Sequence, residues 1–166
     1  MDKKKIIENY TNELLEKYKE YRPTTEIEQD WGCYQSSVYI KNKDKELEIM
    51  INENVFIVFY EDWHDAWNLT RNNYNNIINI LDNLMSNKIC IISIYSKNCC
   101  EYIKYSEKKE YKKNEILSII KEEVAKIINP VTKKGSYDML KEDGATVIIT
   151  YWNKKKTMFK FSKKEL

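Results

Sequence analysis

The stretch LEIMINENVFIVFY, residues 47–60, decides the expected fold of this chain. Branched aliphatic side chains occupy every second position of residues 46–51, a period typical of a strand with one buried face. The polar residues 52–54 then form a turn, and residues 55–60 are apolar on both faces. We therefore expect residues 55–60 to be a central strand, covered at least in part on both sides and paired with the strand before it.

Seven segments in all have the length and composition of strands. Tight polar turns join several of them, for example residues 96–98 and 153–156. Because such hairpins dominate, we predict a mainly antiparallel sheet. The expected strands are residues 38–40, 46–51, 55–60, 89–95, 99–105, 145–152 and 157–161.

Three segments carry apolar side chains three or four residues apart, which predicts amphipathic helices. The first, residues 7–21, ends before Pro23. The second, residues 70–85, begins with Thr70 as its N-cap. The third, residues 116–127, is closed by a proline shortly after it.

These elements predict an α+β fold, in which three helices pack on a mainly antiparallel sheet of about seven strands. Residues 131–144 are expected to be irregular or to hold one short strand. No repeat, linker or low-complexity block divides the sequence, so we predict a single domain over residues 1–166.

The charge composition disfavours nucleic-acid binding. The 28 basic residues almost balance 26 acidic ones, for a formal net charge of +2, and only Arg22 and Arg71 are arginines. Arginine supplies the planar fork that reads phosphates and base edges, and it is nearly absent. Lysine clusters occur at residues 108–113 and 154–156, for example, but glutamates share the region of the first, and a solvated face is the better explanation.

Targeting and metal-binding signals are also missing from the sequence. Residues 1–8 lack the apolar stretch of a signal peptide, and the apolar runs 55–60 and 89–95 are far shorter than the roughly 20 residues of a membrane span. The four cysteines show no paired zinc-ligand spacing, so we expect free thiols, with Cys90 in the core. We therefore expect a cytoplasmic protein with no membrane association, no metal and no cofactor.

Candidate functional chemistry is concentrated in EDWHDAW, residues 61–67, which holds the only histidine, three carboxylates and two of the four tryptophans. An acidic, aromatic surface is complementary to a basic partner, and tryptophan is a common anchor at protein interfaces. We therefore expect a partner-binding surface here, with Tyr34 and Tyr39 adding aromatic area. Its candidate residues are Glu61, Asp62, Trp63, His64, Asp65 and Trp67.

Two other interpretations of this segment stay open. His64 with Asp62 or Asp65 also suits a metal-dependent hydrolase or nuclease, in which histidine acts as general base or metal ligand. The segment equally suits a polar connection between a strand and a helix, whose indole rings cover the edge of the core. The sequence has neither a nucleophile elbow nor a glycine-rich phosphate loop, so we expect no enzymatic activity.

The strand at residues 55–60, followed by the acidic Trp63-His64 step, resembles small intracellular bacterial proteins of toxin-immunity loci. In those proteins, too, an amphipathic helix and a second strand pair follow, here within residues 70–105. The resemblance covers about the middle third of the chain and rests on this one motif. It implies an α+β protein without catalytic activity that binds and blocks a cognate toxin, and only Trp63 and His64 carry over from it.

Overall fold

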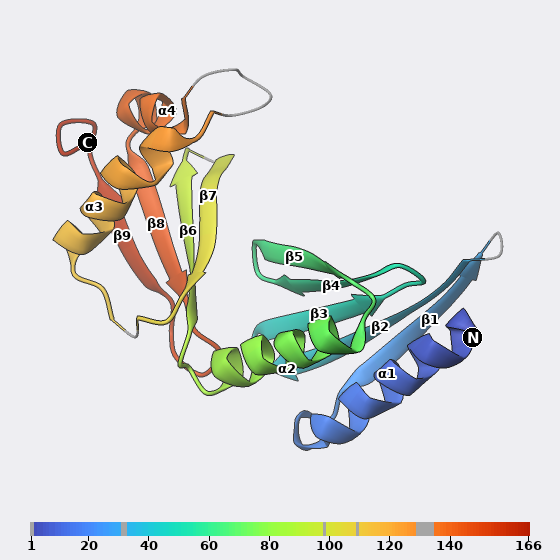
Figure 1. Ribbon diagram of the computed structural model, residues 1–166. Coiled ribbons are helices and arrows are strands. Elements are labelled where there is room, and N and C mark those ends of the chain that lie inside the picture. Colours follow the sequence, from blue (N-terminus) through green and yellow to red (C-terminus); the bar gives the residue numbers. More distant parts are fainter. Residues whose placement is uncertain (1, 31–32, 98, 109, 129–134) are drawn as a thin grey trace. The chain divides into compact units, whose positions relative to one another are not determined.

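The computed structural model describes residues 2–30, 33–97, 99–108, 110–128 and 135–166, and it has an α+β fold (Figure 1). The chain divides into two compact units, Met1–Asp82 (unit 1) and Asn83–Leu166 (unit 2). Each unit contains one antiparallel sheet, and each is described by itself below. The single domain expected over residues 1–166 stays a prediction.

Unit 1 contains a five-stranded sheet, sheet A, in which the strands follow one another in sequence order and every pair is antiparallel. Helix α1 (Lys3–Lys17), the short 3-10 helix η1 (Lys19–Tyr21) and most of α2 (Arg71–Met85) accompany it. The strands are β1 (Thr24–Asp30), β2 (Cys33–Asn42), β3 (Lys45–Ile51), β4 (Val55–Tyr60) and β5 (Trp63–Asn68).

One face of sheet A lies under the two helices. Side chains at every second position of β4 are buried, and the ring of Phe56 packs against α1 through Tyr10, with 5.1 Å between ring centroids, and against α2 through Tyr74, at 5.9 Å. Tyr10 and Tyr74 also touch each other, at 4.7 Å. Aromatic rings bury a large apolar area each, so this cluster joins both helices to the sheet.

The other face of β4 is only half-buried. Val55, Ile57 and Phe59 point away from α1 and α2, and the part of the chain that is described places no helix of unit 1 over them. The strand is thus buried on one side and half-buried on the other, in agreement with the expectation of at least partial cover on both sides. β4 is an interior strand, as predicted, but it is second from the edge because β5 lies beside it.

A charge clamp fixes α2 to α1. The Arg71 guanidinium donates to both carboxylate oxygens of Glu13, at 2.6 and 2.8 Å, and lies over the rings of Tyr10 and Tyr74, at 4.7 and 5.2 Å from their centroids. Lysine cannot make this forked, stacked contact. The chain has only two arginines, and one of them, Arg71, lies where the planar guanidinium makes contacts that lysine cannot make.

Unit 2 contains a four-stranded sheet, sheet B, in the order β7-β6-β8-β9. Helices α3 and α4 cover one face, and the core between them and the sheet includes Ile92, Ile120, Leu140 and Val147. Cys90 also belongs to this core and is fully buried, as predicted. The elements are β6 (Cys90–Ser96), β7 (Cys99–Ser106), α3 (Lys113–Glu122), η2 (Val124–Lys126), α4 (Ser136–Asp143), β8 (Ala145–Thr150) and β9 (Thr157–Phe161).

The α+β class and the antiparallel pairing are as predicted, but the counts were wrong. In the described ranges there are nine strands in two sheets and four α-helices, where one sheet of about seven strands and three helices were expected. The unpredicted elements are β1, β5 and α4. Helix α4 falls in the segment 131–144 expected to be irregular, of which residues 131–134 lie outside the described part of the chain.

The second predicted helix has the expected start, since Thr70 Oγ1 accepts from the Asn73 amide at 3.2 Å. The first helix ends as a 3-10 turn two residues before Pro23. Among the helices that the structure describes, none is long and apolar enough to cross a membrane.

The contact between Arg71 and Glu13 leads to a prediction about the stability of the protein. Replacing Arg71→Lys should lower the free energy of unfolding by about 1 kcal/mol, because the second hydrogen bond and the stacking on two tyrosines are lost while the charge remains. Arg22, the other arginine, is exposed, so Arg22→Lys should change stability by less than about 0.5 kcal/mol. Urea unfolding followed by circular dichroism measures both, and equal effects of the two variants would contradict the role of the clamp.

Candidate functional site

The acidic segment after β4 forms a hairpin and an edge strand. Tyr60 pairs with Trp63, so Glu61 and Asp62 form the two-residue turn, and Glu61 adopts the left-handed region at φ 55°. β5 then runs along β4 as the last strand of sheet A. The alternative interpretation, a polar connection between strand and helix, is met in part: its acids are exposed and its indoles cover the edge of the core, but the connection contains the strand β5.

The β5 side chains divide between the two faces of the sheet. Trp63 and Trp67 stand opposite Tyr60 and Phe56, which are buried, so these indoles lie on the face covered by the helices. Trp63 is 5% exposed, and its ring meets that of the half-buried Trp67 edge-on at 6.4 Å. Trp63 is therefore a core residue rather than an exposed anchor.

The polar candidates remain exposed. Glu61 and Asp62 lie in the turn, and Asp65 lies between the two indoles in sequence and is open to solvent. The Asp65 Oδ1 atom accepts the Ala66 amide at 2.8 Å, which satisfies a backbone donor on this edge strand. His64 points to the opposite face and stacks on Phe59, with 5.9 Å between ring centroids.

This geometry does not assemble the site that a hydrolase needs. Successive strand residues point to opposite faces, so His64 and Asp65 diverge, while Asp62 sits in the turn. Within the described residues, no three His, Cys, Asp or Glu side chains lie close enough together to hold a metal ion. A general base with an orienting carboxylate has to converge on one point, and these side chains do not.

The structure adds a surface that the sequence interpretation missed. The face of sheet A away from α1 and α2, here called the open face, includes His64 and also carries carboxylates from β1 and β3. Tyr39 lies on it, whereas Tyr34 is buried on the other face. The alternate acids at positions 26 and 28, and at 46 and 48, were the available signal. The open face includes Glu26, Glu28, Gln35, Ser37, Tyr39, Lys41, Glu46, Glu48, Met50, Val55, Ile57, Phe59, His64, Ala66 and Asn68.

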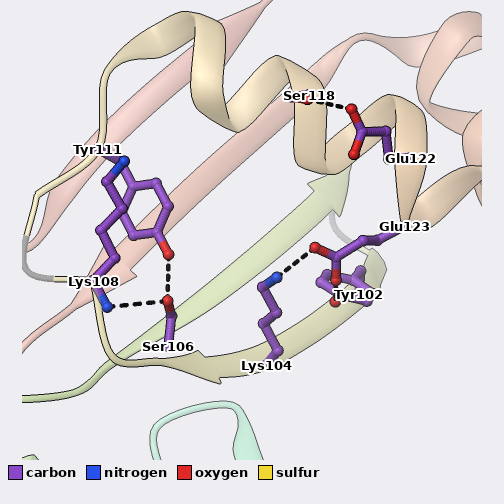
Figure 2. Close-up of polar contacts among 8 residues, drawn as sticks. All are labelled: Tyr102, Lys104, Ser106, Lys108, Tyr111, Ser118, Glu122 and Glu123. Atoms are coloured by element: carbon purple, nitrogen blue, oxygen red, sulfur yellow. Dashed lines mark hydrogen bonds and ion pairs between the residues drawn. The ribbon is translucent and has the colours of Figure 1, made fainter.

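A second polar cluster lies in unit 2, between β7 and the end of α3 (Figure 2). The Glu123 carboxylate accepts from the Tyr102 hydroxyl and from Lys104 Nζ, the latter at 2.6 Å. Burial raises the pKa of Glu123, but the hydrogen bonds from Lys104 and Tyr102 outweigh it and hold this pKa below its ordinary range. Burial and the neighbouring Glu123 raise the pKa of Tyr102, so its phenol stays protonated.

Figure 2 also shows polar contacts among Ser106, Lys108 and Tyr111, at the end of β7 and in the connection to α3. The hydroxyls of Ser106 and Tyr111 are hydrogen-bonded to each other, and Ser106 Oγ also accepts the Lys108 amide at 3.3 Å. Lys108 Nζ pairs with Glu115 at 2.5 Å. Every charge in this cluster has an opposite or hydrogen-bonding partner, which is the arrangement of a structural strap between an edge strand and a helix.

Two cavities lie outside these surfaces. A groove of about 590 Å³ between α1 and α2 is lined by Glu13, Glu16, Lys17, Arg71 and Tyr74 among others. In unit 2, a cavity of about 270 Å³ is lined by Glu110, Tyr111, Tyr151, Lys154, Lys155 and Thr157. Both cavities carry side chains of both charges, so neither selects an anion or a cation by charge alone.

Comparisons of the chain with protein-family models, with curated proteins and with solved structures give no match. The function is therefore argued from the geometry.

The two faces of β5 predict different outcomes for neighbouring substitutions. Trp63→Ala removes a buried indole and should lower the free energy of unfolding by about 3 kcal/mol or more. His64→Ala removes an exposed ring and should cost less than about 0.5 kcal/mol. Chemical denaturation of both variants tests this, and a stable Trp63→Ala protein would show that the indole is not part of the core.

The Glu123 cluster predicts an acid-sensitive contribution to stability. The folded-state pKa lies below the unfolded one, so the contribution is full above the ordinary glutamate pKa and is lost as pH falls through the folded-state value. Glu123→Gln should therefore flatten the loss of unfolding free energy between neutral pH and about pH 3. Glu122→Gln, one residue away and bonded to Ser118, is the matched control because it removes a carboxylate outside this cluster, and an equal flattening in both variants would contradict the role of Glu123.

Proposed function

We propose that this chain binds a protein partner stoichiometrically and without catalysis, as an immunity protein does when it blocks a cognate toxin. The supporting observation is the β4–β5 edge, where exposed Glu61, Asp62, His64 and Asp65 stand on a strand anchored by the buried Trp63. Rigid support of exposed polar groups lowers the entropy lost on binding.

The charge of this edge favours a basic partner. Glu61 and Asp62 project from a tight turn and Asp65 from the strand, and all three are exposed. Acidic groups grouped in this way attract a basic surface during diffusion and discourage acidic partners. The chain would then neutralise the partner by covering its active site or binding surface, and this inhibition requires no catalytic activity from the chain.

The hydrolase alternative has weaker support. It requires His64 to work together with Asp62 or Asp65, and the strand geometry separates these side chains. A binding function requires only that they be exposed, which they are.

Growth rescue tests the proposal. Each product of the reading frames adjacent to this gene is expressed in a bacterial host with and without the chain. We expect one of them to arrest growth, the chain to restore growth, and the two proteins to form a stoichiometric complex in size-exclusion chromatography. If no neighbouring product is both toxic and neutralised, the proposed function is wrong.

A matched pair of variants tests the surface. Glu61→Lys with Asp62→Lys should slow association with the rescued toxin about tenfold or more, because it reverses charge at the proposed contact. Glu107→Lys with Glu110→Lys changes the net charge equally at exposed positions in unit 2 and should have little effect. Equal effects of the two pairs would assign the slower association to net charge rather than to this edge.

A further inference from the structure

The open face of sheet A has an apolar middle that is not fully covered. Cross-strand pairing brings Met50 of β3 next to Ile57 of β4, and Phe59 lies one pair further along β4. These side chains and Val55 are half-buried, although they sit on an interior strand pair. Five strands at ~4.8 Å spacing and ~20 Å length project to about 500 Å² before side-chain relief, which is smaller than the roughly 800 Å² that each partner buries in a standard interface.

Carboxylates flank this apolar middle and are held in position by neutral donors. Glu48 Oε1 accepts from the Ser37 hydroxyl at 2.9 Å, and Glu26 Oε2 accepts from the Tyr39 hydroxyl at 3.1 Å. Burial and the hydrogen bond to Glu26 both raise the pKa of Tyr39, so it remains a donor at neutral pH. A neutral donor orients a carboxylate without cancelling its charge.

The balance of charge on this face is opposite to that of the chain. Among the open-face residues named above, Glu26, Glu28, Glu46 and Glu48 contribute four negative charges and Lys41 one positive charge, a sum of −3 with histidine neutral. The whole chain carries +2. Lys41 pairs with Glu46 at 2.7 Å and also interacts electrostatically with Glu26, so this one cation offsets only part of the negative charge.

We infer that the open face docks a protein surface in which lysines and arginines surround an apolar patch. This inference rests on the proposed binding function and names its partner chemistry. It also extends the contact from the turn at Glu61 to Met50, Ile57 and the flanking glutamates. His64 joins the two surfaces, because it belongs to the β5 edge and also stands opposite Phe59 on the open face.

The physical basis is complementarity. The apolar middle would lose water on contact, which supplies most of the binding free energy, while the flanking carboxylates select a basic rim and speed the encounter. A nucleic acid would be repelled by the same charges. Screening by salt would weaken the encounter, because the acids are exposed or half-exposed.

The first measurement establishes that the face is accessible. The full chain is labelled at methyl groups and backbone amides, and a soluble paramagnetic agent is added during NMR spectroscopy. We expect strong relaxation at Ile57, Met50 and Ala66. Protection of these sites in the free chain would mean that the open face is already covered, and it would overturn the inference.

The second measurement uses a defined basic probe, a catalytically inactivated and strongly basic bacterial ribonuclease, with an acidic protein of similar size as control. Chemical-shift changes should centre on Met50, Ile57 and His64 with the basic probe and be absent with the acidic one. The affinity should fall about tenfold or more when the salt concentration rises from about 50 to about 200 mM. No binding, or shifts centred elsewhere, would refute the proposal.

Isosteric variants separate the face from general charge. Glu26→Gln with Glu48→Gln keeps both hydrogen-bond acceptors but removes two charges, and it should weaken probe binding about fivefold at low salt. Glu107→Gln with Glu110→Gln removes two charges in unit 2 and should leave binding within about twofold. If growth rescue succeeds but the Glu26 and Glu48 pair binds probe and toxin normally, the inference fails while the proposed function stands. If rescue fails but the probe maps to this face, only the toxin-neutralising function is lost.

Discussion

The packing of Phe56 between Tyr10 and Tyr74 is the contact on which the arrangement of unit 1 depends. It places α1 and α2 on the same face of sheet A, and the Arg71–Glu13 clamp holds them together there. Two helices on one side cannot cover the other side. The half-buried apolar side chains of β4 on the open face therefore follow from how the core is built.

Much of this fold could be predicted because its core elements follow a clear period. Residues 55–60 and 70–85 have strong strand and helix patterns, and both occur as predicted. β5 lacks such a pattern, since its middle is polar and exposed, and its turn uses Glu61 in a left-handed conformation where glycine or asparagine is the usual signal. β1 was missed because Ile27 is its only large apolar side chain.

The candidate site was predicted in composition but not in geometry. The segment 61–67 is exposed at its polar positions, as expected of a binding surface, yet strand alternation buries Trp63 and turns His64 away from Asp65. The open face could not be predicted because only the pairing of β1 to β4 sets Glu48 opposite Phe59 and lines Glu26 up with Met50 and Ile57 across the sheet. Such register depends on several hairpins at once, and no single local pattern encodes it.

The bond from the Ala66 amide to Asp65 Oδ1 has a consequence for assembly. Edge strands are templates on which further strands can add, and this is the usual route to open-ended polymers of folded chains. A strand arriving at β5 would have to displace a carboxylate that already occupies the backbone donor, and it would meet the charge of that carboxylate. β5 therefore offers its side chains to a partner while resisting continuation of the sheet, which favours discrete complexes over fibres.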